Sequence, residues 1–478
     1  MDSNTHLYLA IDQGGHASRA SLFTAEGDLL GGASVAIHTR QPAAEHVEHD
    51  PEELVASVHA AVNESLRYAG SAPIVAAGLA TQRSSVVCWD TGSGAALSPV
   101  LSWQDRRTAG WLQQLAKQSA EIRQRTGLPL SPHYGASKLR WCWDHLPAVR
   151  DAGNVGRLAW GPLASFLIYR LTQERTLAAD PANASRTLLW NLDNGDWDPR
   201  LAQLFGIPIQ PLPPCVATRH AWGHIHAGQR RIPLTLVTGD QSAALFAAGE
   251  PAVGTAMINL GTGAFLQQAL DHRPPPSPLL SSLAYQNQAR RIYALEATVN
   301  GAGSAITWLA SQLDRDETEI IRRLPKWLKE HSQPPLFLNG IAGLGTPYLQ
   351  PLFASHFSAE ATAEEKSIAV CESIVFLLRI NLEEMTSSIG PARRIIISGG
   401  LSKLDGICQR LANLSGLPLH RPEDHEATVQ GLLVLLNGGA CVASSRQRLG
   451  TTFLPQADSI LESRYQAWRK ALEAALPR

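Results

Sequence analysis

One short pattern occurs twice in this chain, about 250 residues apart: an apolar strand, a glycine turn and a second strand. The first copy consists of segment 7–11, the turn at Gly14 and Gly15, and segment 18–23. The second copy consists of segment 255–260, the turn Gly261-Thr262-Gly263, and segment 264–268. A recurrence at such a spacing indicates that a whole domain is duplicated. We therefore predict two domains, residues 1–249 and 250–478.

Strands and helices alternate along both halves. Apolar strands are predicted at 74–81, 232–237 and 395–397, and helical patterns dominate from 108 to 170. A helix should begin with Asp50 as N-cap and Pro51 in its first position, with Glu53 completing a capping box, and run to about Arg67. This alternation favours an α/β fold with partly parallel sheets.

Composition excludes several classes of function. Lys and Arg total 41 against 42 Asp and Glu, so no basic surplus exists to bind a nucleic acid or an anionic membrane. The six cysteines show no C-x-x-C spacing, which argues against a zinc knuckle or a redox pair. The polar N-terminus does not resemble a signal peptide, and no apolar stretch reaches the 18 residues of a spanning helix. We expect a soluble, cytoplasmic protein.

Three glycine turns follow strands, at Gly14-Gly15, Gly261-Thr262-Gly263 and Gly399-Gly400. Backbone N–H groups in such turns can converge on phosphate oxygens, although a single turn of this kind is more often a plain hairpin. The chain contains no Gly-Lys pair, no G-x-G-x-x-G and no G-x-S-x-G. A P-loop is therefore excluded, and dinucleotide binding and a hydrolase nucleophile elbow are unsupported.

Two carboxylates accompany these turns. Asp12 ends the first strand, where it could either hold Mg²⁺ beside bound phosphates or cap the strand through an Asx-turn. Asp240 follows the strand at 232–237, where it could either act as a general base or serve as a helix N-cap. Trp103 could stack on the C–H face of a polyol or belong to the core. The pair His46 and His49 is better explained as the entry to the capped helix than as a metal site.

Together these motifs resemble the FGGY family of carbohydrate kinases, and within it the glycerol kinases most closely. The likeness runs through segments 10–14, 18–20, 47–51, 81–83, 103–107, 138–141, 239–244, 261–263, 343–347, 398–400 and 426–428. The resemblance implies two actin-like and hexokinase-like (ribonuclease H-like) domains that flank a cleft for ATP and substrate. ATP would be held mainly by the C-terminal domain and the substrate by the N-terminal one, with domain closure excluding water.

The resemblance also implies roles for individual residues. Asp240 would be the catalytic base, and Asp12 would lie beside the Mg²⁺-bound phosphates. ATP and Mg²⁺ would be the cofactors. The implied nucleotide-binding residues are Asp12, Gly14, Gly15, His16, Arg19, Gly261, Thr262, Gly303 and Gly400. The implied substrate-binding residues are Arg83, Ser84, Trp103, His133, Asp240, Gln241 and Phe265.

Two departures from the glycerol kinase pattern bear on the substrate, and a third bears on phosphate binding. Ser84 stands where those enzymes have a glutamate, and His133 stands where they have a tyrosine. The space opened at Ser84 would suit a larger polyol or a ketose better than glycerol. In the first turn, Gly-Thr-Thr-Ser is replaced by Gly14-Gly15-His16-Ala17, which removes two hydroxyls that would bind phosphate. His16, when protonated, could donate to the γ-phosphate instead.

Three functional hypotheses follow. The first is an ATP-dependent kinase that phosphorylates a terminal hydroxyl of a small polyol or sugar. The second is a ketopentose kinase of the xylulokinase or ribulokinase type. The third, prompted by the altered first turn, is a catalytically weak nucleotide-binding regulator or scaffold. A small molecule is the expected partner, and the resemblance also allows a homodimer.

Overall fold

The computed structural model describes residues 6–329, 333–423, 426–438 and 450–476. The first glycine turn joins β1 (Leu7–Gln13) to β2 (Ala17–Thr24) in a six-stranded sheet of order β12-β13-β6-β1-β2-β3. Strands β1, β2 and β3 (Leu29–Ala36) are antiparallel neighbours. On the other side, β1, β6 (Ile74–Thr81) and β13 (Arg230–Gly239) run parallel, and β12 (His224–Ala227) closes the edge. The carboxyl ends of three parallel strands thus share one edge of this sheet.

The second sheet repeats this arrangement around the second turn, which joins β14 (Thr255–Leu260) to β15 (Ala264–Leu270). Its order is β16-β17-β15-β14-β20-β21-β22. Strand β14 is antiparallel to β15 and parallel to β20, as β1 is to β2 and β6. The other strands are β16 (Leu280–Gln286), β17 (Arg291–Val299), β20 (Arg394–Ser398), β21 (Leu419–Pro422) and β22 (Gly450–Phe453). The shared strand order confirms the duplication and the α/β class.

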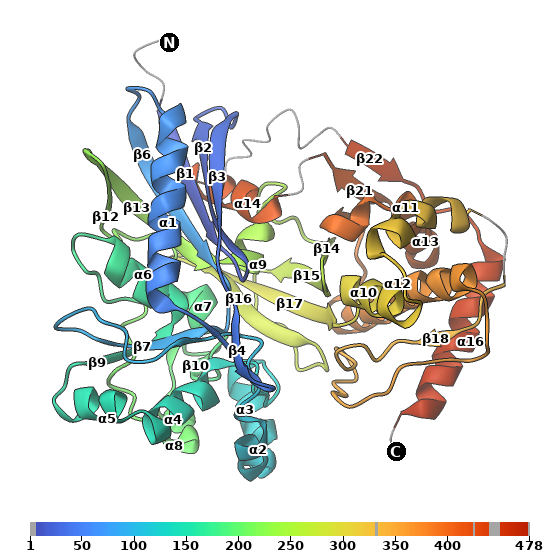
Figure 1. Cartoon of the computed structure of the whole chain (residues 1–478), viewed down its shortest axis with the longest axis horizontal. Coiled ribbons are helices and arrows are strands. Elements are labelled where there is room, and N and C mark those ends of the chain that lie inside the picture. The colour runs from blue at the N-terminus through green and yellow to red at the C-terminus, as the bar shows by residue number, and fades with distance from the viewer. Residues whose placement is uncertain (1–5, 330–332, 424–425, 439–449, 477–478) are drawn as a thin grey trace.

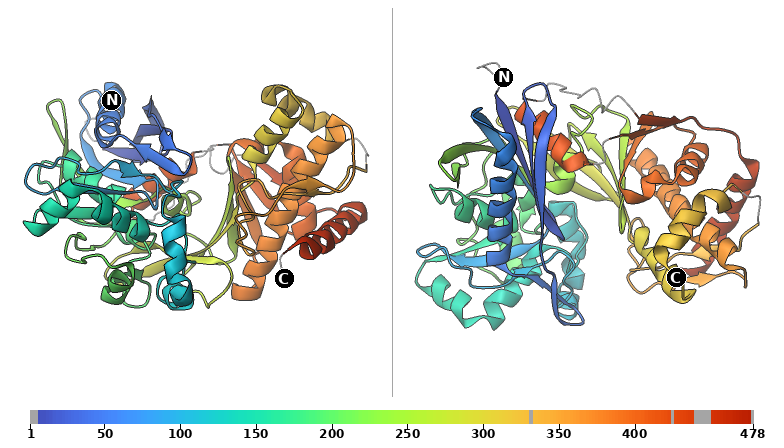
Figure 2. Two further views of the ribbon diagram at one scale, coloured as in Figure 1. Left: turned by 60° about the horizontal axis from the view of Figure 1, so that its bottom comes forward. Right: turned by 45° about the horizontal axis from the view of Figure 1, so that its top comes forward.

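Helices cover both sheets and form two lobes joined in the middle (Figure 1, Figure 2). In the first lobe lie α1 (Pro51–Ser65), α2 (Ala109–Leu112), α3 (Ser119–Thr126), α4 (Gly135–His145), α5 (Pro147–Asn154), α6 (Leu163–Leu171), α7 (Pro181–Ala184), α8 (Pro199–Phe205) and α9 (Asp240–Ala244). In the second lie α10 (Gly303–Gln312), α11 (Glu317–Trp327), α12 (Ala363–Ile389), α13 (Asp405–Ser415) and α16 (Ser459–Ala475). None of the helices among the described residues is both long and apolar enough to cross a bilayer.

Smaller sheets and 3₁₀ turns complete the two lobes. A five-stranded sheet under α4 contains β4 (Arg40–Ala43), β5 (His46–His49), β8 (Val100–Leu101), β7 (Val86–Asp90) and β9 (Leu158–Pro162). Two-stranded ribbons are β10 (Trp190–Asn191) with β11 (Asp196–Trp197), and β18 (Phe337–Leu338) with β19 (His356–Phe357). The 3₁₀ segments are Leu66–Tyr68, Gln113–Gln118 and Gly400–Lys403.

Helix α1 begins at the predicted residue. Asp50 caps it by accepting from the backbone N–H groups of Glu52 and Glu53, and Pro51 occupies the first position. The predicted capping box is wrong, because the Glu53 carboxylate instead accepts from the backbone N–H of His38, at 3.1 Å, and contacts the His38 ring. The helix keeps one cap, and the glutamate ties the end of β3 to the start of α1.

Two elements from the C-terminal half pack against the first lobe. Helix α14 (Ala427–Leu436) contacts α9, β1 and β6, and its leucines share an apolar cluster with Ala10, Phe23 and Phe246. Figure 1 shows α14 between the lobes, beside β1 and α9. Strand β16 contacts α7, α9 and β13. These contacts fix the second sheet to the edge of the first sheet where the parallel strands end.

Candidate active site

The two carboxylates singled out from the sequence lie at that edge, on either side of β6. Asp12 pairs with Ala80 in the β1–β6 register, and Gly239, just before Asp240, pairs with Thr81 in the β6–β13 register. Crevices at the carboxyl ends of parallel strands are where α/β folds place ligands. The fold thus brings together residues that are 228 positions apart in the sequence.

Asp12 carries an electrostatic strain that a cation would relieve. Burial first, and then the acidic neighbours Asp240 and Glu426, raise the pKa of its carboxyl to about 7. Arg19 opposes them, with Nη1 3.5 Å from the Asp12 carboxylate. The described contacts of the Asp12 carboxylate include no backbone N–H, so the Asx-turn interpretation is not supported.

The donor set at Asp12 fits Mg²⁺, which takes one or two carboxylates and fills its shell with phosphate oxygens and water. Across the described part of the chain, no group of three or more His, Cys, Asp or Glu side chains gathers at a metal-binding distance. Asp12 is the residue that would hold a magnesium ion bound with phosphates.

Asp240 opens α9 as its first residue, after the N-cap Gly239. The N-cap interpretation of Asp240 is therefore wrong, although its Oδ1 accepts from the backbone N–H of Gln241 at 2.7 Å. Burial raises the pKa of the Asp240 carboxyl, and Arg83, with Nε 3.7 Å away, limits the rise. A carboxylate with a raised pKa at a quarter-exposed position suits proton acceptance from a bound hydroxyl.

Arg83 reaches Asp240 from the end of β6 and is held by a residue that the sequence reasoning missed. A Cβ on Gly239 would lie 2.5 Å from the Arg83 stem, so only glycine lets the stem cross there. Both terminal nitrogens of Arg83 donate to Glu296 of β17, at 2.8 and 2.9 Å. Arg186 donates to the same carboxylate at 3.4 Å, and the Ser282 hydroxyl also donates to it.

Glu296 stays ionised in this setting. Burial opposes its charge, but Arg186 and Arg83 outweigh burial and lower the pKa of Glu296 to about 2. The signal that could have found it is a lone glutamate within the apolar run Ala294-Leu295-Glu296-Ala297, since a buried acid requires a cationic partner.

Three of the predicted substrate residues form one wall, defined here as Ser84, Trp103, His133 and the neighbouring Tyr134. The rings of Trp103 and His133 lie 5.6 Å apart. Lys138 ties the wall together, because its Nζ donates to the backbone carbonyls of Ser102 (2.6 Å), His133 (2.8 Å) and Ser84 (3.5 Å). Burial, followed by the surrounding cations, lowers the pKa of His133 well below its usual range, so the imidazole is neutral.

The remaining predicted substrate residues are less closely joined to this wall. Gln241 is half-buried beside Asp240 and contacts it through its backbone. Phe265 lies on β15 opposite Asn259, next to the second glycine turn. Within the described ranges, no hydrogen bond or ring contact joins Phe265 to Arg83, Trp103 or His133.

The first glycine turn is a tight hairpin close to the wall. The Gly14 N–H donates to the Ala17 carbonyl at 3.0 Å and is therefore already used. A Cβ on Gly15 would lie 4.0 Å from the indole nitrogen of Trp103, which places the turn beside the substrate wall. His16 is exposed at the tip, and its carbonyl accepts from the backbone N–H of Ile37 at 3.0 Å.

The second and third turns meet at the end of β14. The N–H of Gly303, at the start of α10, donates to the Gly261 carbonyl at 3.0 Å, and a Cβ on Gly303 would lie only 2.8 Å from that oxygen. Gly399 likewise packs against the Leu260 carbonyl, while nothing lies within 4 Å of a Cβ on Gly400. Thr262 is exposed between them. The structure thus brings Gly261, Thr262, Gly303 and Gly400 together at the start of a helix, where phosphate binding is favoured.

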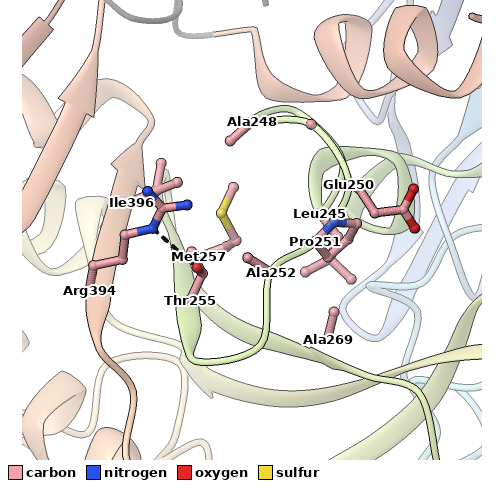
Figure 3. Close-up of a pocket in the computed structure, with 11 residues that line it drawn as sticks. Leu245, Ala248, Glu250, Pro251, Ala252, Thr255, Met257, Ala269, Arg394 and Ile396 are labelled. Atoms are coloured by element: carbon pink, nitrogen blue, oxygen red, sulfur yellow. Dashed lines mark hydrogen bonds between the residues drawn. The ribbon is translucent and has the colours of Figure 1, made fainter. Parts of the chain in front are cut away.

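A separate hollow lies at the opposite end of the second sheet. It is lined by the segment 248–252 between the lobes, with Thr255, Met257, Arg394 and Ile396 from the amino ends of β14 and β20 (Figure 3). Arg394 Nε donates to the Thr255 hydroxyl at 3.2 Å across one side. Because the glycine turns follow the carboxyl ends of these strands, this hollow is not part of the predicted site.

Comparison with known proteins agrees with this geometry. Residues 7–247 match the N-terminal domain of the FGGY family of carbohydrate kinases, and residues 256–439 match its C-terminal domain. Glycerol kinase from Alkalilimnicola ehrlichii is 35% identical over 98% of both chains, and that from Thermus brockianus is 33% identical over 98% of both.

Solved structures share the fold. Plasmodium falciparum glycerol kinase with ADP superposes with a TM-score of 0.89 at 22% identity, covering 99% of each chain. Xylulose kinase from Rhodospirillum rubrum gives a TM-score of 0.86 at 19% identity, covering 98% of each chain. The predicted two-domain α/β organisation is confirmed by these likenesses. The chain belongs to the FGGY family of carbohydrate kinases, phosphotransferases that act on an alcohol group.

Proposed function

We propose that this enzyme transfers the γ-phosphoryl group of ATP to a terminal hydroxyl of a small polyol or sugar, with Mg²⁺ bound beside the phosphates. The observation that carries the proposal is the pair Asp12 and Asp240, two carboxylates with raised pKa values that flank β6 at one sheet edge. Asp12 is suited to hold a cation, and Asp240 is suited to accept a proton. Phosphoryl transfer requires both functions side by side.

In this proposal Asp240 accepts the proton of the attacking hydroxyl while Arg83 orients the Asp240 carboxylate from 3.7 Å. Mg²⁺, when bound, neutralises charge on the phosphates, and Asp12 is the residue that would hold it. Arg19 and the turn Gly14-Gly15-His16 support the phosphates from the first lobe. Gly261, Thr262, Gly303 and Gly400 bind the nucleotide from the second lobe.

On the acceptor side, Arg83, Ser84, Trp103, His133, Gln241 and Phe265 are proposed to bind the substrate. The two substitutions at Ser84 and His133 favour an acceptor larger than glycerol, so a ketopentose stays a second candidate. Approach of the two lobes would align the hydroxyl with the γ-phosphate and exclude water.

Three further points belong to the proposal. Residues 1–249 are taken as the substrate-binding domain and 250–478 as the nucleotide-binding domain. The enzyme would work in the cytoplasm, where ATP is supplied. A homodimer is the proposed assembly, which light scattering on purified protein would test.

The test is coupled-assay ADP release from Mg²⁺-ATP across glycerol, erythritol, arabitol, xylitol, xylulose, ribulose, gluconate and sedoheptulose. The variant Asp240→Asn serves as the blank, and we expect its turnover to fall about 10²- to 10⁴-fold with ATP binding retained. Turnover that is equal in wild type and variant would refute Asp240 as the base. ATP binding without turnover of any acceptor would favour a nucleotide-binding scaffold.

A further inference from the structure

The substrate wall carries more positive charge than its own carboxylates balance. Four cations contact it or adjoin it: Arg83 next to Ser84, Lys138 on the carbonyls of Ser84 and His133, Arg106 on the Trp103 carbonyl, and Arg186 over the Tyr134 ring at 5.2 Å. The Tyr134 ring in turn lies 4.9 Å from that of His133. All four cations act on the His133 imidazole.

Two carboxylates contact these four cations, and the charge of a third, Asp105, attracts Arg106 and Lys138. Glu296 binds Arg83 and Arg186, and Asp240 faces Arg83. Lys138 and Arg106 hydrogen-bond only to backbone carbonyls, those of Arg106 being Trp103 and Asp105 at 3.0 and 3.4 Å.

The next carboxylates along the chain are already engaged. Arg107 donates to the Asp105 carboxylate through both Nε and Nη2, and its Nη2 also donates to Glu48 at 2.6 Å. Asp105 is hydrogen-bonded to Arg107 rather than to Arg106 or Lys138, so five cations, Arg107 included, share the four carboxylates Glu296, Asp240, Asp105 and Glu48. Burial lowers the pKa of Lys138, while its three carbonyl acceptors favour the ammonium form, which has three donors.

The same region holds two buried polar atoms that lack a hydrogen-bond partner. One is the hydroxyl of Ser84, a residue that is 3% exposed and has a left-handed φ of 66°. The other is Nε of Arg186, a residue that is 4% exposed. An arginine nitrogen can only donate, so an acceptor oxygen is what this position lacks. Buried donors without acceptors are costly unless a ligand or water supplies one.

We propose that the acceptor substrate is a polyhydroxy carboxylate, whose carboxylate lies against the substrate wall near Ser84 while its terminal hydroxyl meets Asp240. This inference rests on the kinase function proposed above and specifies its substrate class. A carboxylate supplies acceptor oxygens only, and its single negative charge offsets the surplus positive charge of the wall. A neutral polyol supplies hydroxyls but no compensating charge.

The reaction itself is unchanged by the carboxylate. The terminal hydroxyl oxygen forms a bond to the γ-phosphorus, the bond from that phosphorus to the β,γ-bridging oxygen breaks, and the hydroxyl proton passes to Asp240. The products are ADP and a phosphorylated acid, and the substrate carboxylate stays ionised throughout.

Matched pairs of acceptors test the proposal: glycerol with glycerate, erythritol with erythronate, xylitol with xylonate, and glucitol with gluconate. We expect kcat/KM for at least one acid to exceed that of its neutral partner at least 10-fold. The KM of the acid should rise with salt, because its binding is electrostatic, whereas that of a neutral acceptor should not.

Two variants separate charge from shape. Ser84→Glu returns a negative charge to the wall and should lower the acid-to-polyol ratio of kcat/KM at least 10-fold. Ser84→Ala, the matched control, removes the hydroxyl without adding charge and should lower that ratio much less. Thermal melts of both variants confirm that the fold is kept.

The outcomes are distinct. If neutral acceptors are turned over as well as or better than the acids, with Asp240→Asn inactive, the carboxylate proposal is overturned and the kinase function stands. If no acceptor of either kind gives ADP above the Asp240→Asn blank, the proposed function fails and the substrate proposal fails with it.

Discussion

Arg83 and Glu296 form a two-pronged ion pair between the two sheets: the guanidinium follows β6, the carboxylate lies on β17, and the two N–O distances are 2.8 and 2.9 Å. Both side chains are almost fully buried. The pair directs the remaining nitrogen of Arg83 towards Asp240. The second lobe thereby sets the position of Arg83, a proposed substrate residue, on the first.

Replacement of Glu296 should expose this dependence through the pH profile of stability. The pKa of Glu296 is about 2 in the folded protein against an ordinary value of 4.5. Its stabilisation, about 3 kcal/mol, is therefore present above pH 4.5 and is lost as the pH falls towards 2. Glu296→Gln should lower the thermal midpoint at pH 7 and flatten its decline in acid.

The control for this prediction is Glu26→Gln, at an exposed position in a turn. It should leave both the midpoint and its acid dependence unchanged. A Glu296→Gln protein whose melting curve tracks the wild type from pH 7 to about pH 3 would contradict the assigned ion pair.

Asp12 should lower the stability of the metal-free protein while being required for kinase activity. Its carboxyl is buried beside Asp240 and Glu426, which raise its pKa, so its ionised form is destabilising in the absence of a cation. Asp12→Asn should raise the thermal midpoint in metal-free buffer at pH 8 and abolish the further stabilisation that Mg²⁺-ATP gives the wild type. Kinase activity should fall with it. A midpoint that drops in metal-free buffer would refute the electrostatic account.

The strand–turn–strand duplication, the strands at 74–81 and 255–260, and the start of α1 were all predictable, because each depends on local pattern and capping. The same holds for Asp12 and Asp240, which lie where apolar strands end. What local pattern could not show is pairing across the fold. Glu296 acquires its role from Arg83, 213 positions away, and α14 packs on a sheet formed by the other half of the chain.

The capping box at Glu53 failed for the same reason. The spacing was right, but the end of β3 brings the backbone N–H of His38 within 3.1 Å of the Glu53 carboxylate. A tertiary partner thus replaced the local one. Likewise, the sequence motif at 138–141 contained Lys138 but gave no sign that its amine joins three separate backbone segments.

His16 provides a test of the altered first turn. The side chain is exposed at the tip of the turn, where the pattern of relatives has hydroxyls. His16→Ala should raise the KM for ATP several-fold, because the variant loses a ring N–H that can donate to a phosphate oxygen. His16→Thr, which supplies a hydroxyl donor instead, should restore the KM. Identical KM values for wild type and His16→Ala would remove His16 from phosphate binding.

Lys138 should control acceptor binding without affecting the nucleotide. Its amine is buried and donates to the carbonyls of Ser84, Ser102 and His133, which precede or belong to the substrate wall. Lys138→Met keeps the length of the side chain but leaves those carbonyls unsatisfied, at a cost of about 2 to 4 kcal/mol in stability.

Because the Lys138→Met substitution would loosen the wall, the KM for the acceptor should rise at least 10-fold. The KM for ATP should rise much less, since Gly261, Gly303 and Gly400 lie on the other lobe. Lys117→Met, at an exposed position of the same lobe, is the matched control and should change neither constant. Equal rises in both KM values would show a general loss of structure and would contradict a specific role for Lys138 in shaping the acceptor site.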